Sequence, residues 1–154
     1  MISTKGRYAL RVMVDLAQHE EDKSEASPDE RGSFIPLEEI AERQGISKKY
    51  LEIILKALVQ HKLLKGLRGK GGGYKLTRRP KDYTVGEVLT ITEGNLAIVS
   101  CLLDTEEPCA RQCDCITFPM WKEFDRLTHD FFFNITLEDL VNKKIPKPQK
   151  GSEK

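Results

Sequence analysis

All four cysteines of this 154-residue chain lie in one short segment, as Cys101, Cys109, Cys113 and Cys115. Clustered thiols in an intracellular protein bind metal or sense redox state more often than they form stable disulfides. Their thiolates could hold an iron–sulfur cluster or a tetrahedral zinc ion. They could also act as a thiol switch, or be unreactive. Zinc sites usually contain CxxC pairs, and this segment has none.

The charge of the chain is divided between two consecutive regions, although the net charge is only +1. Residues 35–81 contain twelve Lys or Arg and four Asp or Glu, whereas residues 82–118 contain one Arg and seven acidic residues. This division indicates a nucleic-acid-binding surface followed by a region with another task. Two ordinary solvated surfaces are the alternative that charge alone leaves open.

No segment is apolar and long enough to predict a membrane span. The N-terminal sequence MISTKGRYAL also lacks the apolar core of a secretory signal. We therefore expect a cytoplasmic protein with no membrane partner. The length suits one domain with a sizeable core and an appended dimerisation element.

The spacing of apolar residues predicts helices over residues 4–19, 37–44 and 48–60. Gly45 ends the second helix and Ser47 is a plausible N-cap for the third, so the two form a helix-turn-helix. The acidic segment over about 20–34 has no apolar periodicity and predicts an inserted loop. Residues 64–67 and 74–77 predict two strands, because the consecutive glycines between them allow a tight turn.

Three further helices follow the predicted hairpin. Thr84 caps a short helix, Pro119 opens a long one over about 120–132, and Thr136 caps the last. The predicted fold class is mainly α with a small β-hairpin. A winged helix-turn-helix domain over residues 1–83 precedes a cysteine-containing sensor and dimerisation region over residues 84–142, and residues 143–154 form a disordered tail.

The second helix of a helix-turn-helix enters the major groove of DNA, and its first turn meets the base edges. Cations on a narrow, glycine-rich hairpin suit the minor groove or the phosphates beside it. The start of the first helix could add phosphate contacts. The DNA-binding residues predicted in these three places are Lys5, Arg7, Ser47, Lys48, Lys49, Tyr50, Glu52, Arg68, Lys70, Gly71 and Gly72, with Lys75, Arg78 and Arg79 as further hairpin cations.

The long helix after the cysteines carries a broad apolar stripe formed by Trp121, Phe124, Leu127 and Phe131. A small winged domain has too little surface to bury all of it. A twofold partner is the common solution, and it would match a palindromic DNA site. Packing of the stripe on its own domain is the alternative.

Three segments carry a family resemblance: STKGRYAL, IPLEEIAERQGISKKYLEIILKAL and LLKGLRGKGGGYKLTR. They resemble the IscR/NsrR/CymR (Rrf-type) family of winged helix-turn-helix transcription regulators, and VGEVLTITEG, CITFPMW and NITLEDLV extend the similarity almost to the tail. The resemblance implies a homodimer that binds a pseudo-palindromic operator in double-stranded DNA. It also implies that Glu52, the glutamate of YLE, helps to select among operator types.

Iron–sulfur members of this family use three cysteines in this loop, which correspond to Cys101, Cys109 and Cys115. The resemblance thus implies one 2Fe–2S or 4Fe–4S cluster per subunit. The chain departs from the family in two positions, because Phe118 replaces the histidine of IscR and Arg7 replaces the acidic ligand of NsrR-like members. The fourth ligand therefore stays open, with candidates Cys113, Asp114, Asp104, Glu106 and Glu107.

The predicted function is a DNA-binding transcriptional regulator, mostly a repressor, whose operator affinity depends on an iron–sulfur cluster or on redox state. The alternative is a metal-free or zinc-bearing CymR-like repressor controlled by a partner protein or by thiol oxidation. An enzyme is not expected, because the chain has no nucleophile–base pair, phosphate-binding loop or dinucleotide fingerprint.

Overall fold

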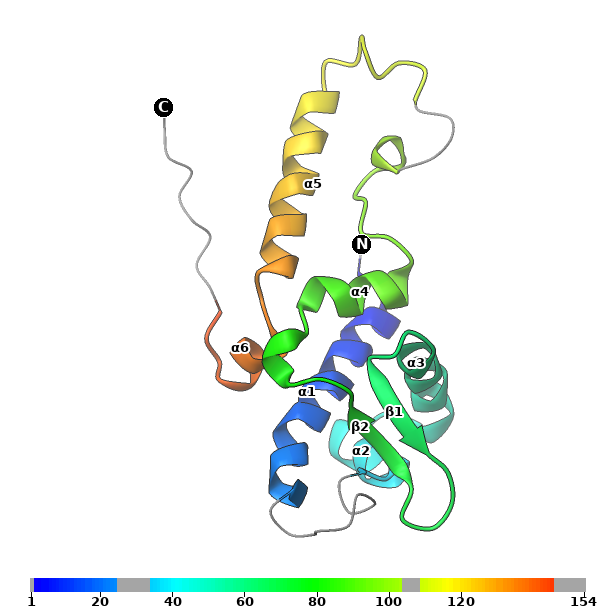
Figure 1. Cartoon of the computed structure of the whole chain (residues 1–154). Helices are drawn as coiled ribbons and strands as arrows, with labels where there is room; N and C mark the ends of the chain where they lie inside the picture. The colour runs from blue at the N-terminus through cyan, green and yellow to red at the C-terminus, as the bar shows by residue number, and fades with distance from the viewer. Residues whose placement is uncertain (1, 25–33, 104–108, 146–154) are drawn as a thin grey trace.

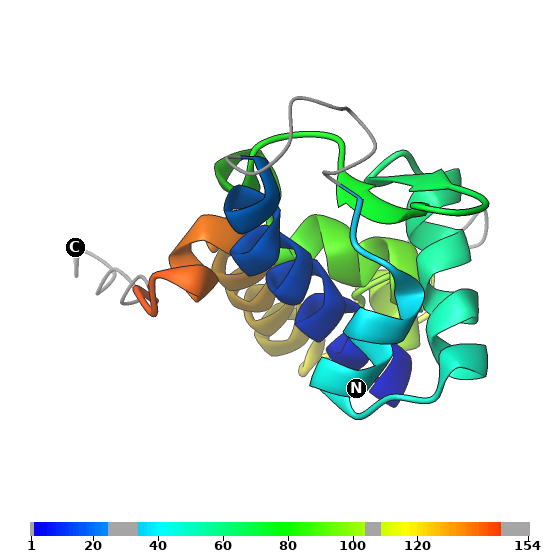
Figure 2. The ribbon, with the colours of Figure 1, turned by 90° about the horizontal axis from the view of Figure 1, so that it is seen from below.

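The computed structural model describes residues 2–24, 34–103 and 109–145, and its helices are arranged around a central helix, α1 (Figure 1). Viewed from below, α3 and the hairpin lie on one side of α1, and α6 lies on the opposite side (Figure 2). The mainly helical fold with a two-stranded hairpin is confirmed for the described residues. The elements are α1 (Thr4–Ser24), α2 (Leu37–Gln44), α3 (Lys48–Gln60), β1 (Leu64–Leu67), β2 (Gly73–Leu76), the 3-10 turn η2 (Pro80–Asp82), α4 (Val85–Glu93), the 3-10 turn η3 (Ser100–Leu102), α5 (Phe118–Phe133) and α6 (Leu137–Val141).

The first three helices share one apolar core, and α2 and α3 have the predicted bounds. Gly45 ends α2 in the left-handed conformation, with φ 62°, and the Ser47 hydroxyl accepts a hydrogen bond from the Tyr50 N–H. The predicted stripe of α1 is buried. However, α1 continues to Ser24 and does not end near His19. Glu and Lys favour helix, so a polar last turn needs no apolar periodicity. Residues 25–33 of the predicted loop lie outside the described residues.

The hairpin pairs Leu64 with Leu76 and Leu67 with Gly73, in antiparallel register. Its second strand starts and ends one residue earlier than predicted, at Gly73 and Leu76. The turn depends on glycine because Gly71 has φ 75°, and a Cβ at Gly72 would clash with the carbonyl oxygen of Leu67.

A buried tyrosine fixes the base of the hairpin. Tyr83 is fully buried, and its hydroxyl donates to the carbonyl oxygen of Leu63 at 2.8 Å. The Tyr83 hydroxyl oxygen in turn accepts the backbone N–H groups of Thr77 and Arg78, each at 2.8 Å. These bonds join residues at both ends of the hairpin to Tyr83, which lies just before the N-cap of α4. The hairpin is therefore held against the helical core.

The chain after α5 returns to the core formed by α1 to α4 and the hairpin, which together we call the winged part. Leu137 of α6 and Val88 of α4 belong to the same buried cluster as the α1 and α3 stripes, so this core includes residues on both sides of residue 83. Thr84 caps α4 as predicted, and Thr136 caps α6. The sequence TLEDLVNKK predicts a helix to residue 144, but α6 ends at Val141 because Lys143 adopts a left-handed conformation with φ 55°.

In contrast, α5 extends away from the other helices (Figure 1) and contains no buried residue. It begins at Phe118, slightly before the predicted start, and ends at Phe133. Its C-terminal end is the part that packs closely, because a Cβ at Gly86 of α4 would clash with the Phe133 ring. Among the described helices, none is long and apolar enough to cross a membrane.

Candidate DNA-binding surface and cysteine segment

The first turn of α3 presents charged side chains to solvent. Ser47, Lys48 and Lys49 are exposed, and so is Glu52 one turn later. Lys48 donates to Glu38 of α2 at 2.9 Å, and this hydrogen bond lowers the pKa of the Glu38 carboxyl group. Any contact of Lys48 with DNA must therefore replace an exposed ion pair, which costs little.

Tyr50 is only half exposed. Its ring packs edge to face against Tyr8 of α1, with 5.9 Å between the ring centroids. The guanidinium of Arg11 lies 5.3 Å from the centroid of the Tyr8 ring. Tyr50 thus has a packing role, and its contact with DNA stays a prediction.

A buried carboxylate on α1 holds the helix-turn-helix in place. Asp15 is 1% exposed and accepts two hydrogen bonds from Arg43 in the last turn of α2, at 2.9 and 2.7 Å. Its Oδ1 also accepts the Gln44 side-chain amide at 2.8 Å, while Arg11 donates to the amide oxygen and the carbonyl oxygen of Gln44. The hydrogen bonds that Arg43 donates to Asp15 raise the pKa of the Arg43 guanidinium. We call this group of four residues the α1–α2 clamp.

Sequence reasoning did not identify the α1–α2 clamp. The available signal was an acid inside the apolar stripe of α1 together with an arginine in the last turn of α2. Because the clamp holds the turn that leads into α3, it positions the recognition helix relative to α1.

The cations of the hairpin differ in how they are engaged. Arg68 and Lys70 are exposed beside Gly71 and Gly72 at the turn, where they were predicted to meet DNA. At the base, Arg78 pairs with Glu87 at 2.6 Å and Arg79 pairs with Asp82 at 3.2 Å. Lys75 lies over the Phe34 ring, at 4.8 Å from its centroid. The turn is thus the more available cationic part of the hairpin.

The predicted phosphate contacts on α1 lie at its first turn. Arg7 is exposed and donates to the Thr4 hydroxyl at 3.2 Å, whereas Lys5 is half buried. Just before them, the N–H and hydroxyl of Ser3 donate to Glu93 at 3.1 and 2.8 Å. These bonds join the start of the chain to the end of α4.

The cysteines lie in two parts of the chain. Cys101 is half buried in η3, whereas Cys109 and Cys113 are exposed and Cys115 is half exposed before α5. Within residues 2–24, 34–103 and 109–145, no three His, Cys, Asp or Glu side chains gather as a metal site would require. The single chain therefore does not bring the predicted ligands together. The candidate oxygen donors Asp104, Glu106 and Glu107 lie outside the described residues.

Cys115 lies just before α5 and contacts the N-cap of this helix. Its Sγ lies 3.4 Å from the Thr117 hydroxyl, and this hydrogen bond lowers the pKa of the Cys115 thiol. The Cys115 carbonyl oxygen accepts the Phe118 N–H at 3.1 Å. Thr117 is the N-cap of α5, so any group bound at Cys115 acts on the first turn of this helix.

The predicted dimerisation stripe lies on the surface of α5. Phe124, Leu127 and Phe131 are 50%, 51% and 43% exposed, and Trp121 is half buried. Elsewhere on the helix, Arg126 pairs with Glu123 and Asp130, each at 2.6 Å. Contiguous exposed apolar side chains of this size typically mark an interaction site. The dimer itself stays a prediction.

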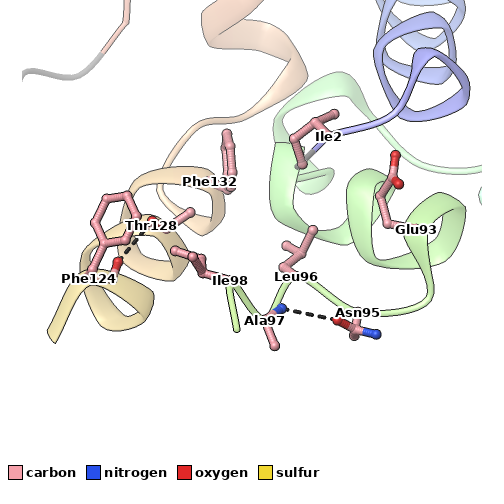
Figure 3. Close-up of a pocket in the computed structure, with 9 residues that line it drawn as sticks. All are labelled: Ile2, Glu93, Asn95, Leu96, Ala97, Ile98, Phe124, Thr128 and Phe132. Carbon is pink, nitrogen blue, oxygen red and sulfur yellow. Dashed lines mark hydrogen bonds between the residues drawn. The ribbon is translucent and has the colours of Figure 1, made fainter. Parts of the chain in front are cut away.

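A hollow of about 580 Å³ separates α5 from the segment that follows α4 (Figure 3). The Ile98 N–H donates to Asp125 of α5 at 3.4 Å next to this hollow. α5 therefore contacts the winged part through a small number of residues along this side. The lining residues are Ile2, Glu93, Asn95, Leu96, Ala97, Ile98, Phe124, Thr128 and Phe132.

A helix-turn-helix followed by a basic, glycine-rich hairpin defines a winged-helix protein of the DNA-binding, non-enzymatic class. The chain also matches the Rrf2 family of iron-dependent transcriptional regulators over residues 2–143. It belongs to this family, and it is a transcriptional regulator of the IscR/Rrf2 type.

Individual relatives and solved structures agree with this assignment. The regulator IscR of Pectobacterium atrosepticum is 38% identical over 144 residues, which cover 93% of this chain and 80% of that protein. The structure of CymR, the global cysteine regulator of B. subtilis, has a TM-score of 0.70 and 31% identity, over 93% of this chain and 97% of that one. The T. potens IscR structure has a TM-score of 0.69 and 31% identity, over 99% and 93%.

Proposed function

We propose that this regulator binds a pseudo-palindromic operator as a homodimer, and that an iron–sulfur cluster at the cysteine segment controls its affinity. One observation carries the proposal: the thiol-rich segment leads directly into α5, whose apolar stripe leaves Phe124, Leu127 and Phe131 43–51% exposed in the described chain. The relatives named IscR, and the family description as iron-dependent regulators, favour a cluster over zinc.

The donor set suits an iron–sulfur cluster because such clusters are held by cysteine thiolates. Cys101, Cys109 and Cys115 would hold it, and Cys113 is the candidate fourth ligand. Cys109 and Cys113 are exposed, and the hydrogen bond from Thr117 already favours the thiolate of Cys115. A bound cluster would supply redox sensitivity and a covalent cross-link between η3 and the start of α5.

A series of contacts connects the cysteine segment with the helix proposed to bind DNA. Ligation at Cys115 would fix the first turn of α5 through Thr117, and ligation at Cys101 would fix the segment that includes Ile98. That segment is bonded to Asp125 of α5 and follows α4, which packs against α1 and α3. A difference in cluster affinity between two arrangements of these elements would therefore change DNA affinity by at most the same factor.

The exposed apolar stripe of α5 supports the proposed twofold arrangement. Two copies that cover each other's stripe of Phe124, Leu127 and Phe131 would place two α3 helices in successive major grooves of one operator. The residues proposed to contact the operator are those of the α3 first turn and the hairpin turn.

The first experiment is anaerobic purification followed by an absorption spectrum and by iron, sulfide and zinc analysis of the same sample. We expect a coloured protein with matched iron and sulfide. Single Cys101→Ala, Cys109→Ala and Cys115→Ala variants should lose both while keeping their helical circular dichroism. Cys113→Ala is the informative comparison, because it loses the cluster only if Cys113 is the fourth ligand. Normal iron content in all three of the first variants would overturn the ligand assignment.

DNA binding is tested separately from the cluster. Lys49→Ala and Arg68→Ala should each weaken binding and reduce the slope of log affinity against log salt by about one. Lys122→Ala, which removes an exposed lysine from α5, should change neither. Equal effects of all three variants would contradict the proposed surface.

The CymR-like alternative is favoured by two observations. Two of the four thiols are exposed in the described chain, and the B. subtilis CymR fold covers 93% of the chain. In that case the protein would stay colourless after anaerobic cluster reconstitution and would still bind its operator. Zinc content and the response of DNA binding to a thiol oxidant would then distinguish a zinc site from a thiol switch.

A further inference from the structure

One large apolar side chain on the recognition helix is left in solvent. Ile53 is 53% exposed, whereas its neighbours Leu51, Ile54 and Leu55 are fully buried in the core of the winged part. Among the described residues, every other exposed large hydrophobic lies at position 116 or beyond. Ile53 therefore lies outside the buried core that α3 packs against.

The surroundings of Ile53 are those of the proposed base-reading surface. Ile53 lies one turn after Lys49 and next to Glu52, and all three side chains are exposed. Residues four apart on a helix share a face, so Lys49 and Ile53 point to the same side. Isoleucine is β-branched and has one strongly preferred χ1 rotamer in a helix, which holds its methyl groups in a fixed position.

An apolar side chain in the major groove has one matching partner on the base edges. Thymine carries a C5-methyl group there, whereas the other groups that specify base pairs are hydrogen-bond donors and acceptors. Isoleucine can neither donate nor accept, so opposite a polar edge it would displace water without replacing its hydrogen bonds. Opposite a thymine methyl group, isoleucine leaves no base hydrogen bond unsatisfied, and the contact removes the apolar surface of both groups from water.

We propose that Ile53 is a specificity-determining residue that packs on the C5-methyl group of one thymine in each operator half-site. This inference rests on the proposed binding of α3 in the major groove. It adds an apolar element to a surface whose other predicted contacts are charged or polar. The operator should therefore contain a required A·T pair in a fixed orientation at this position of each half-site.

The test compares thymine with deoxyuridine, which lacks only the methyl group. A duplex is first selected by the wild-type protein from a randomised pool, and each thymine in it is then replaced singly by deoxyuridine. Burying one methyl group changes an affinity by about threefold to fivefold. We expect a loss of this size at one thymine per half-site for the wild-type protein. Ile53→Ala should bind the thymine and deoxyuridine duplexes equally at that position and keep the wild-type response elsewhere.

Two further variants make the result specific. Ile53→Val keeps a β-branched apolar side chain and should retain part of the response. Ile145→Ala removes an isoleucine that is 49% exposed near the other end of the described chain, and it should retain the full response. Because Ile53 is exposed, Ile53→Ala should keep the wild-type melting temperature.

The outcomes separate this inference from the function on which it rests. A wild-type protein that enriches no duplex from the pool contradicts DNA binding itself. A wild-type protein that enriches a duplex but tolerates deoxyuridine at every thymine overturns the methyl contact alone. The same conclusion follows if Ile53→Ala discriminates thymine from deoxyuridine as strongly as the wild type does.

Discussion

The winged part and α5 place their apolar side chains in opposite ways. In the winged part, α1 and α3 each bury a stripe in one core, which also receives Val88 from α4 and Leu137 from α6. In α5, a helix of sixteen residues with a comparable apolar stripe, no side chain is buried. The winged part is therefore specified by contacts within one chain. In contrast, α5 leaves its apolar stripe half exposed in the single chain, where the proposed second copy would cover it.

The two kinds of functional residue also lie in different structural surroundings. The proposed DNA contacts stand on helices and a hairpin that the core holds rigidly, as in the case of Tyr83 beneath the hairpin. The cysteines stand in irregular segments between the core and α5. A sensor built in this way could change the position of α5 without unfolding the reading surface.

The largest expected effect tests the core of the winged part. Leu55→Ala removes a fully buried side chain of α3 and should lower the free energy of unfolding by about 2–5 kcal/mol. The measurement is urea denaturation followed by circular dichroism. Leu127→Ala makes the same change on α5, where the side chain is 51% exposed. Any effect of this control on unfolding should depend on protein concentration, whereas that of Leu55→Ala should not. Equal, concentration-independent losses would remove the distinction between the two parts.

Much of the winged part could be predicted because its signals are local. Gly45 and Ser47 set the bounds of α2 and α3, and both act through their own backbone conformation and immediate neighbours. Apolar periodicity identified the buried face of α1 in the same way. The polar end of α1, from His19 to Ser24, was missed because a helical turn without apolar residues carries no apolar periodicity.

The second prediction concerns the α1–α2 clamp. Asp15→Asn removes the charge that accepts both bonds from Arg43 and should lower the free energy of unfolding by about 2–3 kcal/mol. The expected loss is below that of a fully buried pair because the Arg43 side chain is 29% exposed. Glu38→Gln, which breaks the exposed pair with Lys48, should cost less than about 1 kcal/mol. A loss for Asp15→Asn no greater than for Glu38→Gln would show that the clamp adds no stability.

The α1–α2 clamp also shows what the sequence could not provide. One helix carries Asp15 and another carries Arg43 and Gln44. Only the packing of α1 against α2 brings these side chains into contact. The cysteines present the same difficulty more strongly. Their spacing predicts a shared site, but the described chain does not gather them, because spacing does not encode how the irregular segments around them fold. Tyr83 was missed because a buried hydroxyl with three partners looks like any aromatic core residue in sequence.

The third prediction tests whether a second copy covers α5. The double variant Phe124→Ala/Leu127→Ala truncates two half-exposed side chains and should raise the dimer dissociation constant about 100-fold, from the apolar area lost. Analytical ultracentrifugation over a range of concentrations measures this change. Lys122→Ala, an exposed substitution on the same helix, should leave the constant unchanged. A monomeric wild-type protein at high concentration would contradict the proposed dimer.

The smallest expected effect lies at the junction where the chain returns from α5 to the winged part. There the hydroxyl and N–H of Thr136 donate to the Asp139 carboxylate at 2.7 and 2.9 Å, and the Asp139 N–H donates back to the Thr136 hydroxyl at 3.0 Å. Thr136→Ala removes the hydroxyl, so it should cost about 1 kcal/mol in urea denaturation. Thr136→Ser keeps the hydroxyl and should cost much less.

The pH dependence of this capping interaction has a definite sign. The bonds from Thr136 lower the pKa of Asp139 below its ordinary value of 3.8. A lowered pKa in the folded state gives stability that is present above the unfolded pKa and lost as pH falls through the folded pKa. The stability difference between the wild type and Thr136→Ala should therefore narrow below pH 3.8, and the pKa of Asp139 in the variant, followed by NMR, should rise towards 3.8. A difference that does not change with pH would mean that the Thr136 hydroxyl stabilises α6 through the bond that it accepts from the Asp139 N–H, and not through its bond to the Asp139 carboxylate.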